Sequence, residues 1–231
     1  MKEKKSKRFK EINTLIKDIT EAVTIEQAVE TLKKLPPVKF DETIEMSLKL
    51  GVDPKKADQQ VRGTVSLPHG TGKTLSVVVL AKGEKEKEAK DAGADFFGSE
   101  EIIEKIKGGW TSFDALIATP DMMREVGKLG KILGPRGLMP TPKAGTVTTD
   151  IAKAVKEIKA GKVEFKVDKN CQLNNIVGKV SFAKEKLVEN INKLMEAIIK
   201  AKPSSAKGIY IKSMFLATTM GPGIKIDVQS L

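Results

Sequence analysis

The chain has 231 residues, of which 40% are hydrophobic, enough for one large domain or for two smaller domains with separate cores. Lys and Arg together number 41 against 30 Asp and Glu, so the formal net charge is +11. A positive excess of this size favours a polyanionic partner, either nucleic acid or an anionic membrane surface. A basic protein without such a partner is the remaining alternative.

One cysteine, Cys171, and one histidine, His69, restrict the chemistry of the chain. They exclude an intrachain disulfide and a Cys/His structural zinc site, and they fit a reducing, cytosolic compartment. No apolar run approaches the ~18 residues that a membrane span requires. The segment Met1–Arg8 is basic but is followed by no apolar signal core, so we expect a basic arm. We expect no membrane partner, no metal and no cofactor.

The N-terminal part begins with helical periods and then changes to a strand period. Apolar residues at helical spacing predict a short amphipathic helix over Lys7–Ile19. Thr24 and Gln27 form a capping-box pattern before a second helix, which Pro36 ends. The alternation over Phe40–Leu50 predicts a strand with one buried face.

The middle of the chain alternates strands with helices. After a polar turn region at Gly51–Arg62, we expect strands at Leu75–Ala81, Ala94–Phe97 and Asp114–Thr119, and helices at Glu84–Ala92, Ser99–Gly108, from Pro120 onward, and at Ile151–Ala160. This order predicts a parallel, doubly wound, Rossmann-like sheet. The Gly- and Pro-rich loop Gly130–Val147 carries Lys131, Arg136 and Lys143, and is interpreted either as a second contact surface or as a solvated loop.

The C-terminal part returns to the strand period. Strands are expected at Val163–Asp168, around Ile176–Val180, at Ile209–Ala217 and at Ile224–Val228, with a long amphipathic helix at Lys184–Lys202. The last two strands flank a turn at Gly221-Pro222-Gly223.

The two ends of the chain therefore share one pattern and the middle has another. We predict an α/β protein with two domains: a discontinuous α+β domain at 1–67 plus 160–231, and an inserted parallel-sheet α/β domain at 68–159. Two crossings, near Gly63–Gly72 and near Gly161, would form a hinge, which glycine would make mobile and paired strands would make stiff. The segment 68–159 holds 15 Lys/Arg and 13 Asp/Glu, so the outer segments carry +9 of the +11 net charge.

Enzyme motifs in the middle segment are incomplete. His69–Thr74 resembles a P-loop, but position 67 is leucine where that motif needs glycine, and a strand follows where it needs a helix. No G-x-G-x-x-G follows Ala81, which argues against a dinucleotide site. Asp114 and Asp121 are interpreted as turn and helix-cap residues. A nucleotide-binding enzyme using the inserted domain and a protein-interaction module remain the alternatives.

Nucleic-acid binding is the function that the residues favour. Aromatic residues make up only 4% of the chain, which argues against a single-strand binder that stacks bases. RNA helices instead present phosphates and 2′-hydroxyls, which suit hydroxyl, amide and lysine groups. Such groups lie at Thr43, Ser213, Thr218 and Thr219, with Lys39, Lys166, Lys169 and Lys212 nearby. Phe40 is either a stacking or a core residue, and the turn at Gly221 is either an RNA contact or a plain hairpin.

Four segments in order resemble the bacterial ribosomal protein L1 family over essentially the whole chain. They are Lys39–Thr43, Val61–Val65, Leu133–Pro140 and Thr218–Pro222. The resemblance implies a split α/β domain with an inserted Rossmann-like domain. Its implied partners are a helical junction of 23S rRNA, the cell's exit-site tRNA and the chain's own messenger RNA, whose translation it would repress.

The resemblance also implies a non-catalytic, monomeric, cytoplasmic protein that forms a mobile stalk of the large ribosomal subunit. By motif match it assigns RNA binding to these residues: Lys39, Phe40, Thr43, Lys166, Asp168, Lys169, Ser213, Thr219, Met220 and Gly221.

Overall fold

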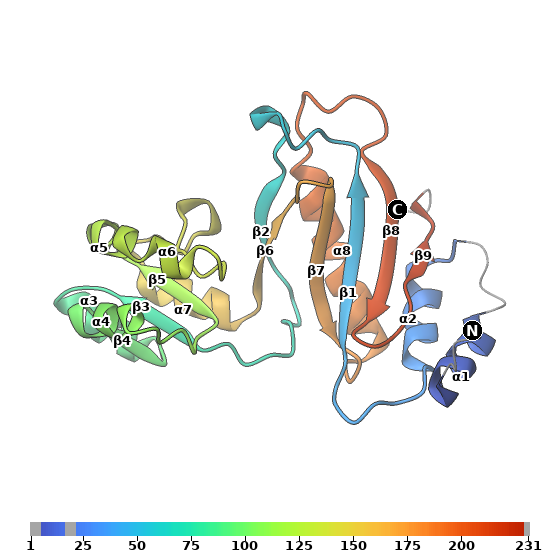
Figure 1. Ribbon diagram of the computed structural model, residues 1–231, viewed down its shortest axis with the longest axis horizontal. Coiled ribbons are helices and arrows are strands. Elements are labelled where there is room, and N and C mark those ends of the chain that lie inside the picture. Colours follow the sequence, from blue (N-terminus) through green and yellow to red (C-terminus); the bar gives the residue numbers. More distant parts are fainter. Residues whose placement is uncertain (1–5, 17–21, 229–231) are drawn as a thin grey trace, which may run out of the picture. The chain divides into compact units, whose positions relative to one another are not determined.

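The structure, a computed structural model, describes residues 6–16 and 22–228. The chain divides into two compact units (Figure 1): Met1–Gly72 with Val163–Leu231, here called the outer unit, and Lys73–Lys162, here called the inserted unit. The mixed α/β class is confirmed, while separate domains and a hinge between them stay predictions. No helix among the described residues is long and apolar enough to cross a membrane.

A four-stranded antiparallel sheet forms the centre of the outer unit. Its order is β7-β1-β8-β9, with bounds Thr43–Leu50 for β1, Gln172–Lys179 for β7, Ile211–Thr218 for β8 and Ile224–Ile226 for β9. Strand β1, from the N-terminal part, lies between β7 and β8, from the C-terminal part, and pairs with both (Figure 1). Residues from the two ends of the sequence therefore build one sheet.

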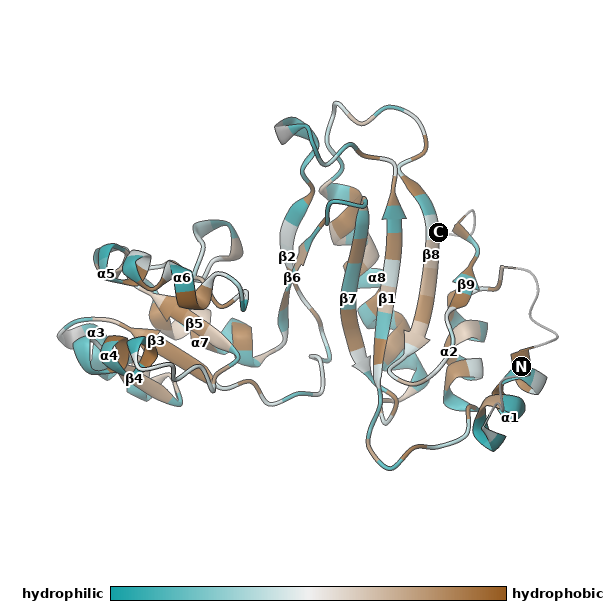
Figure 2. Ribbon diagram, in the orientation of Figure 1, coloured by the Kyte–Doolittle hydropathy of each residue, from teal (hydrophilic) through white to brown (hydrophobic). Residues whose placement is uncertain are grey.

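Alternation along β1 gives this sheet one buried and one open face. Ile44, Met46 and Leu48 are at most 1% exposed, whereas Glu45 and Lys49, between and beyond them, are exposed. Figure 2 shows the corresponding change of hydropathy along β1. Helices α2, Ile25–Lys33, and α8, Lys184–Lys200, pack against the buried face. The predicted apolar stripe of α8 is buried there, at Leu187, Ile191, Leu194, Met195 and Ile198.

The N-terminal helices begin as the sequence predicts. In the capping box, the Thr24 hydroxyl accepts from the Gln27 N–H at 3.4 Å, and the Gln27 side chain accepts from the Thr24 N–H at 3.3 Å. Helix α1 spans Lys7–Ile16. Its expected end at Ile19 and the first part of the basic arm lie outside the described residues.

The first crossing contains paired strands, one of the two alternatives that the sequence leaves open, although no strand was placed there. After a turn region up to Arg62, strand β2 spans Arg62–Ser66 and pairs with β6, Lys162–Lys166. A Cβ at Gly63 would lie only 2.6 Å from the ring of Phe165, at Cζ. Glycine is required at this position because an aromatic ring packs on the strand, not because the chain bends there. Likewise, β7 begins at Gln172, well before the expected Ile176.

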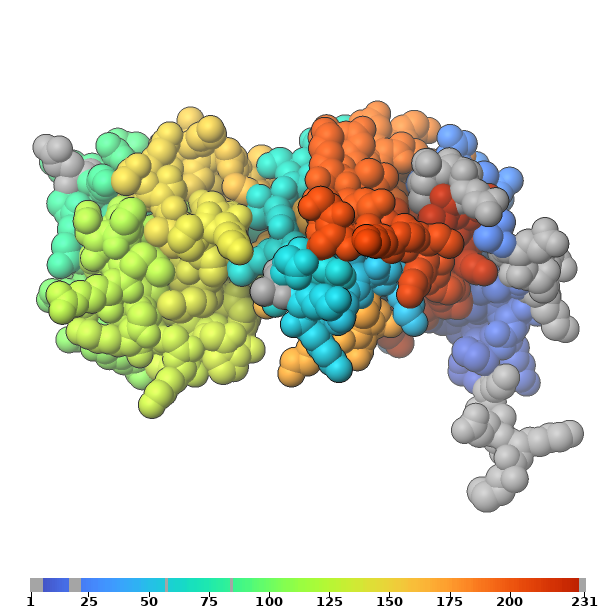
Figure 3. Space-filling model, turned by 90° about the horizontal axis from the view of Figure 1, so that it is seen from above, coloured from blue at the N-terminus to red at the C-terminus, as the bar shows by residue number. Residues whose placement is uncertain are grey.

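Loops from the two sequence ends also pack together within the outer unit. The Gly51 N–H donates to the Tyr210 carbonyl at 2.7 Å, and the Gln59 amide, at the end of the short helix η1 (Ala57–Gln59), donates to the Ser205 carbonyl at 3.4 Å. Figure 3 shows this contact from above, where cyan residues near 55 lie against orange-red residues near 205. In the outer unit, the two sequence ends are therefore joined by loop contacts as well as by the sheet.

A three-stranded parallel sheet forms the inserted unit. Strands β4 (Phe96–Gly98), β3 (Val77–Leu80) and β5 (Ala115–Ala118) stand in the order β4-β3-β5. Val77 and Val79 face a core with α3 (Glu84–Asp91) and α7 (Ile151–Lys159). Val78 and Leu80 face a second core with α4 (Glu100–Lys107), the 3-10 turn η2 (Pro120–Met122) and α5 (Met123–Lys128). Both faces of this parallel sheet are therefore covered by helices, and β3 and β5 are hydrophobic along their length (Figure 2).

The segment expected as the loop Gly130–Val147 is partly helical. Helix α6 spans Gly130–Leu133, and the 3-10 turn η3 spans Pro142–Ala144. Leu133 is fully buried, and the Arg136 guanidinium donates to the Thr111 hydroxyl. Internal contacts therefore fix part of this segment, and Arg136, one of its three cationic residues, takes part in them.

Candidate nucleic-acid interface

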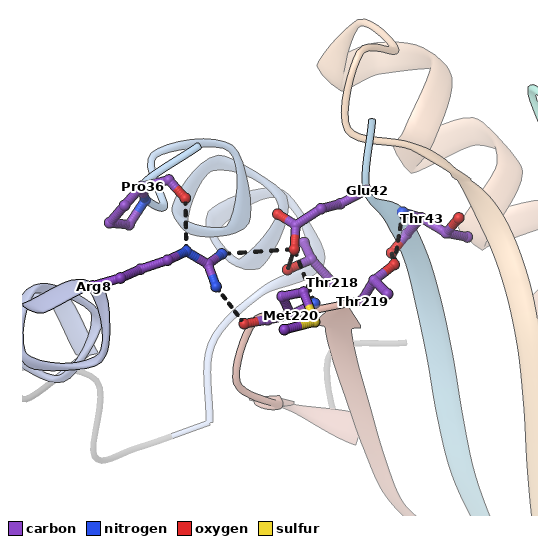
Figure 4. Close-up of polar contacts among 7 residues, drawn as sticks. All are labelled: Arg8, Pro36, Glu42, Thr43, Thr218, Thr219 and Met220. Carbon is purple, nitrogen blue, oxygen red and sulfur yellow. Dashed lines mark hydrogen bonds and ion pairs between the residues drawn. The ribbon is translucent and has the colours of Figure 1, made fainter. Parts of the chain in front are cut away.

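The turn after β8 is bonded directly to the start of β1. The Thr219 N–H donates to the Thr43 carbonyl at 3.1 Å, and the Thr43 N–H donates to the Thr219 hydroxyl oxygen at 3.0 Å (Figure 4). The same hydroxyl lies 3.4 Å from the Thr43 carbonyl, to which it donates. A hydroxyl oxygen has two lone pairs, so one stays available to a ligand after these bonds. Thr219 therefore builds the turn and still offers an acceptor.

Glu42 anchors the next residue of the turn. Its side chain is buried, with the residue only 6% exposed, and its Oε1 accepts from the Met220 N–H at 2.9 Å. The Thr218 hydroxyl lies 3.5 Å from the same oxygen. Sequence reasoning missed Glu42, although a signal exists: it is in phase with Ile44 and Met46 and therefore lies on the buried face of the strand.

Gly221 is needed for packing inside the turn. A Cβ there would lie 2.2 Å from the Thr218 hydroxyl oxygen and 3.0 Å from a Leu35 methyl carbon. The missing side chain faces the protein, so packing inside the turn explains why this position is glycine. Gly221 lies in the turn beside Met220, which is 57% exposed, and its contact with RNA stays a prediction.

Exposed groups surround this turn at one end of the open face. Lys39 and Phe40 precede β1 and are both exposed, Phe40 by 53%. Phe40 is thus a surface residue, so the core interpretation is wrong, while stacking on a ligand stays a prediction. Lys179, a residue that sequence reasoning missed, donates from Nζ to the Thr43 hydroxyl at 2.8 Å. No local pattern points to Lys179, because it reaches Thr43 only through the pairing of β7 with β1.

The remaining predicted residues gather at the opposite end of the sheet. Ser213 pairs with Lys49 across β8 and β1, and Lys49 pairs with Gln172 on β7. At ~3.3 Å per residue, this end lies roughly 20 Å from Thr43 along β1. The ten predicted residues therefore form two groups, near opposite ends of β1, instead of a single cluster.

A turn before β7 brings the other three residues to that second end. The Asp168 carboxylate accepts from the N–H groups of Asn170 and Gln172, both at 2.8 Å, so its first role is to build the turn. Cys171 has a left-handed backbone in this turn, with φ of 64°. Lys166 and Lys169 flank the turn and are exposed. The lysines supply positive charge, while Asp168 shapes the backbone that carries Lys169.

Polar and apolar groups cover the open face between the two ends. Ser47 of β1 pairs with Asn174 on one side and with Phe215 on the other, and Phe215 pairs with Lys225 of β9. Phe215 is 38% exposed. The open face is therefore a continuous surface of hydroxyl, amide, apolar and charged groups, including the carboxylate of Glu45, and it can bind a ligand.

Acidic and metal-ligating side chains are scattered over the described residues. Within 6–16 and 22–228, no three His, Cys, Asp or Glu side chains are grouped to hold a metal ion. In the inserted unit, the hydrogen bond from the Lys73 ammonium, at 2.5 Å, lowers the pKa of Asp114. Asp114 also accepts from the Ser76 N–H at the amino end of β5. This carboxylate therefore joins two segments of the fold and does not face the carboxyl ends of the strands, where such sheets bind ligands.

The fold and the open face define a basic α/β protein with one exposed, polar sheet face. Residues 31–222 match the family described as "Ribosomal protein L1p/L10e family". The chain belongs to this family.

Curated relatives align over nearly the full length. The chain is 64% identical to "Large ribosomal subunit protein uL1" of Protochlamydia amoebophila (strain UWE25), covering 97% of this chain and 94% of that protein. It is 59% identical to the protein of the same name from Kosmotoga olearia, over 99% and 98% of the two chains. For the Chlamydia caviae protein of that name the identity is 57%, over 98% of each chain. These matches lend no support to the enzyme alternative.

Proposed function

We propose that this chain is a ribosome-associated, cytoplasmic component of the large ribosomal subunit and binds 23S rRNA through the open face of the outer unit. The family and the names of the relatives support the ribosomal assignment. The observation that supports the open face is the turn at Thr219 and Met220, which is held from inside by a buried carboxylate while its outer groups stay exposed.

The shape and chemistry of the open face suit helical RNA. Its two groups of candidate residues lie roughly 20 Å apart, so an elongated ligand can contact both. Double-stranded RNA presents 2′-hydroxyls and phosphates across a shallow minor groove, which uncharged donors and acceptors can approach. Thr43, Ser213 and Thr219 offer such groups, and Phe40 and Met220 offer exposed apolar contacts.

Lysines provide the part of binding that does not depend on sequence. Lys39 and Lys179 lie at the Thr219 end, and Lys166 and Lys169 lie at the Ser213 end. The segments outside 68–159 carry +9 of the +11 net charge. We therefore propose that the outer unit, folded as a discontinuous domain, attracts the RNA, and that the inserted unit, as a domain joined through a hinge, contributes less.

Further roles follow from the family resemblance and belong to the same proposal. The protein would be monomeric when free and would form the mobile stalk near the tRNA exit site, where it would meet exit-site tRNA. It would repress translation of its own messenger RNA by binding a mimic of the rRNA junction on the same face. It would act without catalysis and without a cofactor.

The test compares two threonine-to-valine variants in binding to a 23S rRNA fragment that contains the helical junction. Thr219→Val should weaken binding by ~1–3 kcal/mol, because it removes a polar group from the contact and from the turn. Thr31→Val is the matched control, since the Thr31 hydroxyl donates to the Gln27 carbonyl on helix α2, away from the open face. Equal affinity for both variants would refute the proposed site.

A salt titration tests the phosphate contacts separately. Log affinity should fall linearly with log salt concentration, and each lost phosphate contact should reduce the slope by ~0.9. Lys39→Ala should lower the slope, and Thr219→Val should leave it unchanged. A flat titration for the unmodified protein would contradict the phosphate contacts.

A further inference from the structure

Arg8 of helix α1 contacts the turn that follows β8, although 212 positions separate it from Met220 in the sequence. Its Nη1 donates to the Met220 carbonyl at 3.0 Å, and its Nε donates to the Pro36 carbonyl at 3.3 Å. Its Nη2 lies 3.6 Å from Oε1 of Glu42 (Figure 4). One guanidinium thus connects helix α1, the segment before β1 and the turn.

Arg8 and Glu42 together bind the backbone of Met220 on both sides of its Cα. Glu42 accepts from the Met220 N–H at 2.9 Å, and Arg8 donates to the Met220 carbonyl. The two side chains also form an ion pair with each other. Both peptide groups that flank the Met220 Cα therefore have a charged partner, and such bonds are stronger than bonds between neutral groups.

Because the Glu42 carboxylate is buried, the positive charge of Arg8 beside it is important. The Glu42 side chain is 7% exposed, and the Arg8 side chain is 27% exposed. A buried carboxylate without a partner is costly, and next to an RNA surface its charge would also repel phosphate. The Arg8 Nη2 atom is itself buried and makes no hydrogen bond, so its interaction with Glu42 is one of charge.

We propose that Arg8 and Glu42 are positioning residues that fix the backbone at Met220 in the conformation that binds RNA. This inference rests on the proposed function of the open face. The three guanidinium nitrogens point toward the protein in Figure 4, so Arg8 acts through the turn and not through a phosphate. Helix α1 thereby becomes part of the RNA site without contacting RNA.

The first measurement requires no RNA. In Arg8→Ala, hydrogen exchange at the Met220 amide should become ~10-fold faster or more, because its acceptor Glu42 loses its counter-charge. Arg8→Lys should not restore slow exchange, because a single ammonium nitrogen cannot reach the Pro36 and Met220 carbonyls and the Glu42 carboxylate with the planar geometry of a guanidinium. Lys10→Ala is the matched control: it removes the same charge from an exposed position of the same helix. Unchanged exchange in Arg8→Ala, or full rescue by lysine, would overturn the positioning role.

The second measurement separates positioning from direct contact. Arg8→Ala should weaken binding to the 23S rRNA fragment ~10-fold with an unchanged salt slope, whereas loss of a phosphate contact would lower the slope by ~0.9. Glu42→Gln should weaken binding in the same direction, and the double variant should lose less than the two single losses combined. A lower slope in Arg8→Ala, or additive losses, would contradict the proposal.

The two proposals fail in different ways. If the unmodified protein does not bind the fragment, the proposed function fails, while the exchange at Met220 still tests the pair. If Arg8→Ala does not fold, Arg8→Lys and Glu42→Gln, which keep the side chains close to their original size, give the same two readouts.

Discussion

The two units both combine helices with a sheet, but they differ in how much of the sheet is covered. In the inserted unit, the alternate residues Val77 and Val78 face two separate cores, so both faces of the parallel sheet are buried. In the outer unit, Met46 is buried while its neighbour Glu45 is exposed. Antiparallel sheets commonly leave one face open to water, and parallel sheets do not. The outer sheet therefore offers a broad binding surface that the inserted sheet lacks.

The largest expected effect tests whether the units are independent. Leu48→Ala in the outer core and Ile117→Ala in the inserted core each remove a side chain that is at most 1% exposed, and each should cost ~2–5 kcal/mol. Hydrogen exchange should report the loss only in the unit that carries the change, and only Leu48→Ala should weaken RNA binding. Equal loss of binding in both variants would remove the distinction between the units.

A pair of glycine substitutions tests the turn within the outer unit. Gly221→Ala should destabilise the unit by ~1–3 kcal/mol, because its Cβ would lie 2.2 Å from the Thr218 hydroxyl oxygen. Gly223→Ala is the control, since its Cβ would meet nothing closer than 3.8 Å, at Phe215. Thermal melting and RNA binding measure both changes. Similar losses for the two variants would show that the turn tolerates a side chain at Gly221.

The smallest effect concerns alkaline pH. Burial raises the pKa of Tyr210 in the outer unit to about 12, and its hydroxyl donates to the Ile198 carbonyl at 3.0 Å. The folded unit thus keeps the phenol proton that the unfolded chain releases near pH 10. Tyr210 therefore favours folding fully below about pH 10, and this contribution falls as the pH rises toward 12. Denaturation midpoints of the unmodified protein should fall more steeply over this range than those of Tyr210→Phe; parallel curves would contradict the account.

The sequence predicted those helices and strands well that are determined by interactions between neighbouring residues. The capping box at Thr24 and Gln27 requires only neighbouring residues, and it is present. Apolar residues recur at every second position of β1 and at every third or fourth position of α8. Because each pattern repeats several times, one polar residue does not obscure it. The hydrophobic runs of β3 and β5 are recognisable in the sequence for the same reason, since every position in them is apolar.

Contacts between distant segments could not be predicted in this way. Arg8 and Met220 meet only after the two sequence ends have formed one sheet, and nothing near either residue indicates the other. Strand β2 was missed because Gly63 interrupts its pattern, and that glycine is explained by the ring of Phe165 on another strand. The resemblance assigns RNA binding to the turn residues, which stays a prediction, and it does not point to Arg8 and Glu42, the side chains that hold the turn.

Hydrogen–deuterium exchange of the full chain with and without the 23S rRNA fragment tests the central claim most directly. RNA should protect the start of β1 around Thr43, strand β8 from Ser213 onward and the turn through Gly221, and should leave most of Lys73–Lys162 unchanged. Protection confined to Lys73–Lys162, with Thr43 and Met220 exchanging as in the free protein, would contradict RNA binding by the open face.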